Sequence, residues 1–271
     1  MHPVRQPAVA GAFYPGQGQA LASTVASLLA AAHAQAASAL TAPKALIVPH
    51  AGYIYSGPTA ALAYAQLSAV RSTIRRVVLL GPMHRVPVRG LALAGAAAFA
   101  TPLGEIKVDQ AALASLAHLH QVMTSPAAHA LEHSLEVQLP FLQAVLEDFK
   151  LVPLAVGDAT PAEVAQVLEA LWGGPETLIV ISSDLSHFRP YRAAQAIDQD
   201  TVQQILNLDG PISHQQACGG TPINGLLLAA QRHHLQPRLL NLCNSGDTAG
   251  DKQRVVGYTS IAFTETPHAI H

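Results

Sequence analysis

Residues 178–187 read LIVISSDLSH, an apolar and largely β-branched run that continues through serines and an aspartate and ends on a histidine. Residues 45–50 (ALIVPH) and 77–84 (VVLLGPMH) have the same form and also end on histidine. Short β-branched runs bounded by Pro, Gly and Ser are typical of buried parallel strands. Ligands of open α/β sheets bind beyond the carboxyl ends of the strands. The three segments therefore predict a functional site at one edge of a sheet.

Helix-like and strand-like segments alternate along the rest of the chain. Pro58 and Asp109 have residue types that begin helices, and Pro140 is expected to tighten or kink one. We expect helices over the alanine-rich residues 20–37 and over 60–67, 111–118, 135–149, 161–171, 193–206 and 225–233. Further strands are expected over 87–94, 150–156, 238–242 and 255–262. Such alternation predicts βαβ units, and hence one α/β domain over residues 1–271 with a largely parallel central sheet covered by helices on both faces.

Composition restricts the partners and the setting of the chain. Its 15 Lys and Arg against 17 Asp and Glu give a formal net charge of −2, which argues against nucleic acid as the main partner. No uninterrupted apolar run reaches the roughly 18 residues of a membrane span, and the first residues lack the pattern of a signal peptide. The two cysteines, Cys218 and Cys243, come with no sign of export. We therefore expect no membrane partner and a reduced, cytoplasmic setting.

Six motifs, in the same order along the chain, give a resemblance to a known family. They are residues 49–57 (PHAGYIYSG), 81–84 (GPMH), 132–136 (EHSLE), 182–187 (SSDLSH), 217–223 (ACGGTPI) and 244–247 (NSGD). In these motifs the chain resembles the Memo family, whose bacterial members are called protein B of the AmmeMemoRadiSam system. The resemblance covers nearly the whole chain. The chain departs from it at residues 83–85 (MHR), where the family more often has Ser-His-His.

The resemblance implies a fold similar to that of the class III extradiol dioxygenases, which are non-haem iron enzymes. It implies that His50, His84 and Cys218 match the family's metal ligands. Other polar residues of the same crevice would be Asp184, His187, Glu132 and His133. It also implies partners, because radical-SAM and AMMECR1-like proteins belong to the same bacterial system.

The types of these residues restrict the metal. Two imidazoles and one thiolate suit iron, copper or zinc. Extradiol enzymes use two histidines and a carboxylate instead, which leaves positions open for oxygen and substrate. The softer and more oxidisable thiolate of Cys218 favours copper(I), zinc or a redox role over ring cleavage. We expect one mononuclear transition metal, with iron(II) favoured and copper or zinc as alternatives.

His187 is the candidate general acid or base, because Asp184 precedes it by three residues and a carboxylate at that spacing can orient an imidazole. His133 is the candidate second polar contact in the catalytic group. Plainer alternatives exist for several of the residues. Without the resemblance, His50 and His84 could equally be loop histidines with satisfied hydrogen bonds. Asp184 has the residue type that caps a turn, and Cys218 alone would be a small buried hydrophobic residue.

Three functions are consistent with these residues. The first is a metal-dependent redox or oxygen-using enzyme that acts on an unidentified small molecule. The second is a non-catalytic scaffold whose crevice binds a peptide or a partner from the same bacterial system. The third is a zinc peptidase, because residues 129–133 match the H-x-x-E-H pattern. That pattern requires a helix that starts before His129, and Pro126 puts such a start in doubt. The chain has no G-x-S-x-G motif, which removes the commonest α/β-hydrolase interpretation.

Overall fold

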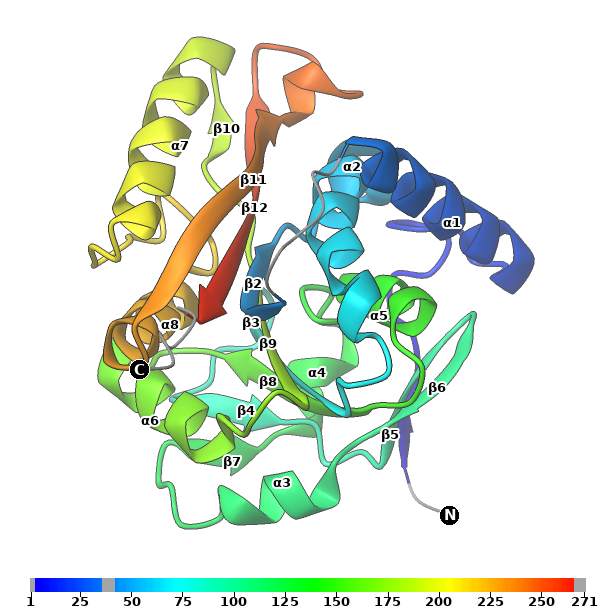
Figure 1. Cartoon of the computed structure of the whole chain (residues 1–271), viewed down its shortest axis with the longest axis vertical. Coiled ribbons are helices and arrows are strands. Elements are labelled where there is room, and N and C mark those ends of the chain that lie inside the picture. The colour runs from blue at the N-terminus through cyan, green and yellow to red at the C-terminus, as the bar shows by residue number, and fades with distance from the viewer. Residues whose placement is uncertain (1–2, 36–41, 266–271) are drawn as a thin grey trace, which may run out of the picture.

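The computed structural model describes residues 3–35 and 42–265. Within these residues nine strands form the larger sheet, in the order β10-β12-β2-β9-β3-β8-β4-β7, with β11 also paired to β12 (Figure 1). The four central strands are parallel to one another: β2 (Pro43–Val48), β9 (Thr177–Ser182), β3 (Arg76–Pro82) and β8 (Lys150–Val156). The flanking strands β10 (His187–Arg189), β11 (Leu235–Asn244) and β12 (Val255–Glu265) pair antiparallel, and β4 (Leu91–Leu93) pairs antiparallel with β8 but parallel with the edge strand beyond it. The α/β class with a parallel centre is confirmed.

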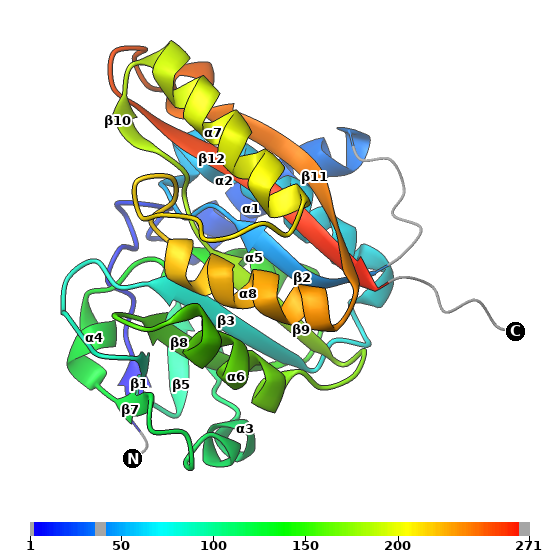
Figure 2. The same ribbon diagram turned by 90° about the vertical axis from the view of Figure 1, so that its left-hand side faces the viewer.

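Helices cover both faces of this sheet (Figure 2). On one face lie α1 (Gly18–Gln35), α2 (Tyr53–Tyr64) and α5 (Leu139–Val145), and on the other lie α6 (Pro161–Leu171), α7 (Tyr191–Leu206) and α8 (Gly220–Arg232). Successive residues of β9 alternate between the two hydrophobic clusters, Leu178 and Val180 in one and Ile179 and Ile181 in the other. Each such buried side chain contributes about 1.5–3 kcal/mol, which explains why the central strands read as continuous apolar runs.

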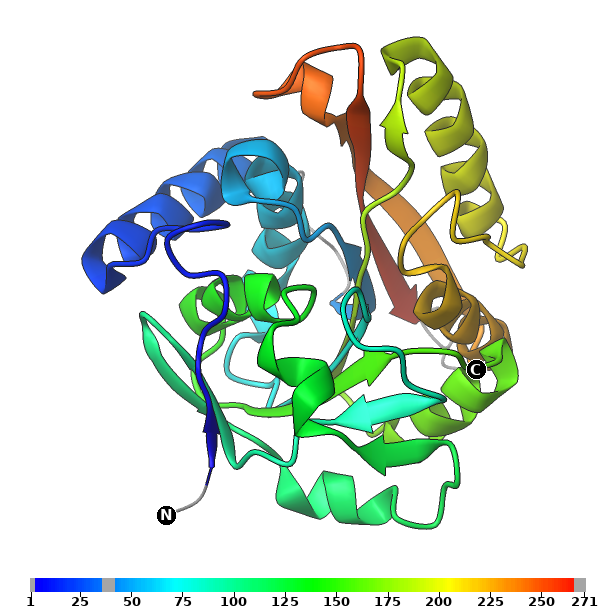
Figure 3. The same ribbon diagram turned by 180° about the vertical axis from the view of Figure 1, so that it is seen from behind.

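Shorter elements complete the fold. A second sheet contains β1 (Val4–Arg5), β5 (Ala98–Thr101) and β6 (Gly104–Lys107), and Figure 3 shows the N-terminal strand beside this hairpin. Strand β7 (Val122–Thr124) forms one edge of the larger sheet, and the short helices are α3 (Gln110–Ser115) and α4 (Pro126–Ala130). The 3₁₀ segments are Ala65–Val70, Glu136–Gln138 and Ser245–Asp247. Over the described ranges, none of the helices is long and apolar enough to cross a membrane.

Residues 36 and 37 of the helix expected over 20–37 lie outside the described residues, and the helix expected over 225–233 begins earlier, at Gly220. Two other expected helices differ more in form from those observed. The helix expected over 60–67 begins earlier, at Tyr53, with Gly52 as its N-cap residue. Pro58 therefore lies inside α2 instead of near its start. The helix expected over 135–149 is a 3₁₀ turn followed by α5, and Pro140 stands in the first turn of α5 rather than at a kink, where its missing N–H costs nothing. Asp109 is confirmed as an N-cap, since its side chain accepts from Ala112 N at 3.1 Å.

Candidate metal centre

Three imidazoles meet at the carboxyl edge of the parallel strands. His50 follows β2 by two residues, and His84 follows β3 by two residues. These strands flank β9 on either side, so the sheet brings both histidines to the same edge. His133 joins them from the loop after α4. One ring nitrogen from each lies within 4.8 Å of the others, and we call these three residues the histidine cluster.

Each ring of the histidine cluster is held through its Nδ1 atom. His84 Nδ1 lies 2.9 Å and His133 Nδ1 3.2 Å from Glu132 Oε1. His50 Nδ1 lies 2.9 Å from Ser182 Oγ, and that hydroxyl donates its own proton to Ser134 O at 2.6 Å. The hydroxyl must therefore accept from His50, so Nδ1 carries the proton. On a neutral ring this leaves the Nε2 lone pair for a metal, the arrangement expected of metal-binding histidines.

Glu132 connects two members of the histidine cluster. Its carboxylate is 2% exposed and also accepts from the backbone N–H groups of His84 (2.6 Å), His133 (2.8 Å) and Ser134 (2.9 Å). Burial alone would raise the pKa of Glu132, but the hydrogen bonds from His133 and His84 outweigh it and hold the pKa well below its usual value. A permanently ionised carboxylate therefore orients both rings.

His50 is the buried member of the histidine cluster, with 1% of its surface exposed. Burial lowers its pKa to about 4, so the ring is neutral at pH 7 and able to bind a cation. Asp184 lies against this residue. Its Oδ1 accepts from His50 N at 2.8 Å, and its Oδ2 lies 4.0 Å from His50 Nε2.

Cys218 places a sulfur beside the histidine cluster. Its Sγ lies 3.4 Å from His50 Nε2 and 3.6 Å from the carbonyl oxygen of Asp184. Burial raises the pKa of the thiol to about 12, and the nearby Asp184 charge adds to this. The thiolate is therefore not formed in advance, and a metal would have to displace its proton. The sulfur is close enough to be a fourth donor.

His187 has different contacts from those expected of it. Its Nδ1 lies 2.8 Å from the carbonyl oxygen of Leu185. Within the described residues, no contact joins it to the carboxylate of Asp184, which is engaged with His50 instead. The Leu185 carbonyl fixes the Nδ1 proton, which leaves Nε2 as a proton acceptor. The orienting group is thus a backbone carbonyl rather than the predicted carboxylate.

His129 is not brought to the histidine cluster. It lies on α4, is 2% exposed, and its Nε2 bonds to the carbonyl oxygen of Ala92 at 2.8 Å. Helix α4 ends at Ala130, so His129 and His133 do not share a helical face. Of the H-x-x-E-H pattern, only Glu132 and His133 belong to the site. The sequence contained this Glu-His pair, but nothing local showed that the carboxylate would hold His84, 48 residues away.

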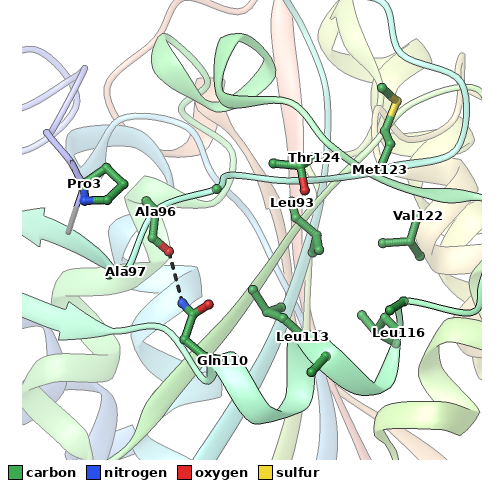
Figure 4. A pocket seen from close by; sticks show the side chains of 13 residues that line it. Pro3, Leu93, Ala96, Ala97, Gln110, Leu113, Leu116, Val122, Met123 and Thr124 are labelled. Carbon is green, nitrogen blue, oxygen red and sulfur yellow. Dashed lines mark hydrogen bonds between the residues drawn. The ribbon is translucent and has the colours of Figure 1, made fainter.

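Two cavities differ in chemical character. A cleft of about 470 Å³ is lined by apolar residues together with five polar or titratable ones, His84, Arg85, Asp158, His214 and Cys218. A larger hollow of about 650 Å³ lies between α3 and β7 (Figure 4). Its lining includes no titratable side chain, and its one drawn hydrogen bond joins Gln110 Nε2 to Ala96 O at 3.3 Å. The smaller cleft is therefore the one that can supply chemistry.

The fold and the site together define an α/β protein with a candidate metal centre at the carboxyl edge of its sheet. Residues 5–262 match the family described as Memo-like protein. The chain is 35% identical to a MEMO1 family protein of Ignicoccus hospitalis, covering 96% of this chain and 98% of that one. It is 36% identical to a MEMO1 family protein of Sulfolobus acidocaldarius, covering 80% and 81%. The chain belongs to the Memo family.

One solved structure is also similar, that of the uncharacterized protein JW3007 from Escherichia coli K12. Its TM-score is 0.49 and its sequence identity 16%, over 80% of this chain and 98% of that chain.

Proposed function

We propose that this chain binds one transition metal at His50, His84 and His133, with Cys218 as an additional donor, and uses it in redox or oxygen chemistry on a small molecule. The observation that carries the proposal is the common state of the three rings. Each has Nδ1 occupied by a second group, which leaves Nε2 as the nitrogen for a metal, and on His50 that nitrogen lies 3.4 Å from the proposed additional donor, Cys218 Sγ. Nitrogens bound about 2.1 Å from one metal lie at most about 4.2 Å apart, so the cluster needs only a small inward movement.

The donor set restricts the metal to few candidates. Imidazole nitrogens suit iron, copper and zinc, and a thiol among them favours a metal that tolerates sulfur. Iron(II) is the favoured ion, with copper or zinc as alternatives. A bound iron or copper ion would supply one-electron and oxygen chemistry. His187, with Nε2 free to accept a proton, is the proposed general acid or base, and Asp184 is proposed to fix the position of His50.

Metal analysis on protein purified without oxygen tests this function. We expect about one metal ion per chain and oxygen consumption that depends on it. His84→Ala should lose most of the metal, whereas His129→Ala, a buried histidine outside the cluster, should keep it. Equal metal loss from the two variants would contradict the assignment of the site.

A second function is a non-catalytic scaffold that binds a peptide or a radical-SAM or AMMECR1-like partner. It is favoured by two large apolar side chains near the site residues in sequence, Ile54 (71% exposed) and Phe188 (60% exposed). Metal analysis also distinguishes this function. A scaffold has no need of stoichiometric metal coupled to oxygen consumption.

A further inference from the structure

The cleft of about 470 Å³ beside the histidine cluster has charged and apolar walls. His84 and Cys218 contribute to its lining, and Val86, Val88 and Val156 are among its apolar residues. Its fully charged side chains are Arg85 and Asp158. A molecule that reaches the candidate metal centre from this side therefore passes an arginine.

Arg85 is unpaired, whereas the neighbouring arginine is not. Arg89 donates to both carboxylate oxygens of Glu163 (2.9 and 3.1 Å) and to Asp158 O at 2.7 Å, and the Asp158 carboxylate lies within its electrostatic reach. Among the described residues no hydrogen bond or ion pair engages the guanidinium of Arg85. The negative charge of Asp158 is thus partly offset by Arg89, while the positive charge of Arg85 is free for a ligand.

The remaining polar lining residue is already occupied. His214 lies 3.3 Å through Nδ1 from Cys218 O and 3.2 Å through Nε2 from Thr221 Oγ1. A guanidinium has five donors in a planar fork that matches a carboxylate, and it stays charged at every relevant pH. Arg85 is therefore the lining residue best able to recognise an anionic group.

We propose that this cleft binds small organic carboxylates, with the carboxylate on Arg85, the apolar body against the valine-lined wall, and the opposite end toward His84 and Cys218. This names the substrate class of the proposed function and rests on it for the reaction, but not for binding.

The chain contains a reporter for binding. It has three methionines, of which Met83 lines this cleft and Met123 lines the separate hollow between α3 and β7. Protein labelled with ¹³C at the methionine methyl groups is titrated with benzoate and with benzamide, its neutral isostere. We expect benzoate to shift the Met83 signal saturably, Met123 to stay unchanged, and benzamide to bind more weakly.

Variants assign the effect to the guanidinium. Arg85→Ala should weaken benzoate binding about five- to tenfold, the loss of one charge-assisted pair at a partly exposed site, and leave benzamide binding unchanged. Arg71→Ala removes the same charge from an exposed pair with Glu147 and should change neither. Equal benzoate affinity in wild type and Arg85→Ala, or no saturable Met83 shift, would overturn the proposal.

Repeating the titration after treatment with a chelator separates this inference from the metal site. Benzoate binding that survives chelation supports pairing with Arg85, even in a protein that carries no metal. Benzoate binding that is present before chelation and lost with the metal would overturn the role of Arg85 and leave the proposed metal centre in place.

Discussion

Glu132 is the residue on which the geometry of the histidine cluster depends most. It bonds to the rings of His84 and His133 and to three backbone N–H groups around them. A metal-binding imidazole is oriented by the partner of its second nitrogen, and loss of that partner typically costs 10–100-fold in affinity. One buried carboxylate here serves two rings at once.

We therefore predict that Glu132→Gln lowers the affinity for Zn²⁺ by about 10–100-fold. The amide is uncharged, and with its oxygen kept at the Oε1 position its NH2 group would face the His84 N–H that Oε2 now accepts from, so both rings would be held more weakly. Competition with a chelating dye measures the affinity, and a thermal melt reports whether the variant is folded. Glu163→Gln, which loses a partly buried carboxylate that pairs with Arg89 and lies outside the histidine cluster, is the matched control and should bind as wild type does. A folded Glu132→Gln protein with unchanged affinity would exclude the positioning role.

The role of Cys218 can be separated from that of the imidazoles with cobalt(II). Its sulfur lies beside His50 Nε2, so the wild-type complex should show a near-ultraviolet charge-transfer band from sulfur to cobalt. Cys218→Ser should lose the band yet retain cobalt, because the three imidazoles remain. Absence of the band in wild type would remove Cys218 from the ligand set. Loss of all cobalt from the serine variant would make the thiol a principal ligand.

At the scale of elements, α6 and α8 pack side by side on one face of the sheet, and a glycine lies at their closest contact. Gly225 of α8 faces Val164 of α6, and a Cβ atom at Gly225 would lie 2.3 Å from Val164 Cγ1. Real carbon atoms do not approach so closely, and the backbone of Ala165 lies only 3.2 Å from the same point. The glycine is therefore required by the close approach of the two helices.

Gly225→Ala should destabilise the protein by about 1–3 kcal/mol, the usual effect of overpacking. Helix propensity alone predicts the opposite sign, a gain of about 1 kcal/mol. Urea unfolding measures the change. Gly57→Ala in α2 is the control, since its Cβ would meet only the flexible end of Leu28 at 3.0 Å and the nearest other atom at 3.4 Å. Gly225→Ala as stable as this control would show that the helices can separate freely.

At the scale of the whole molecule, Arg5 ties the N-terminal segment to the loop that carries His133. Its guanidinium pairs with Glu136 and donates to the carbonyl oxygens of His129 and Glu132. Glu136 also accepts from Tyr14 and from the backbone of residues 8 and 9. The first strand and the candidate metal centre therefore share one buried hydrogen-bond network.

Arg5→Ala should cost about 3–5 kcal/mol of stability, because it leaves the buried Glu136 without its counter-charge. The free energy of unfolding in urea tests this. Arg71→Ala breaks an exposed pair with Glu147 and should cost no more than about 1 kcal/mol. If both variants lost equally little, Glu136 would be sufficiently compensated by its other donors.

The stability of the molecule should also depend on pH through Asp198. Burial raises the pKa of this carboxyl from 3.8 to about 6. The stability of the folded protein is therefore highest, as far as this group is concerned, below about pH 4, and part of it is lost as the pH rises through 6 and the buried carboxyl ionises. Asp198→Asn should therefore be more stable than wild type at pH 7.5, by on the order of 2–3 kcal/mol.

That advantage of Asp198→Asn should shrink as the pH falls from 6 to 4, which urea unfolding at several pH values would show. Asp200→Asn removes the same charge from an exposed position of the same helix and should show no such trend. An advantage of Asp198→Asn that stayed constant with pH would mean that the carboxyl does not titrate in this window.

The sequence by itself was sufficient to predict the strands of the central sheet. Strands β2, β3 and β9 are buried on both faces, so each contains an unbroken apolar run that can be recognised without its neighbours. Parallel strands also share the edge at which they end, and this rule placed His50 and His84 together. Strands at the periphery of the fold were harder to predict from the sequence. The short β5, β6 and β7 were not expected, because strands of three or four residues are too short to show a distinctive pattern.

Only the tertiary structure decided how the polar groups of the site pair. It assigned Asp184 to His50 instead of His187, gave Glu132 to two rings, and brought His133 into the cluster. Hydrogen bonds form between side chains that are 48 or 134 residues apart, and their geometry depends on packing to a fraction of an ångström. A local pattern reports which residues reach the edge of the sheet, whereas contact across the fold determines which atom each one offers.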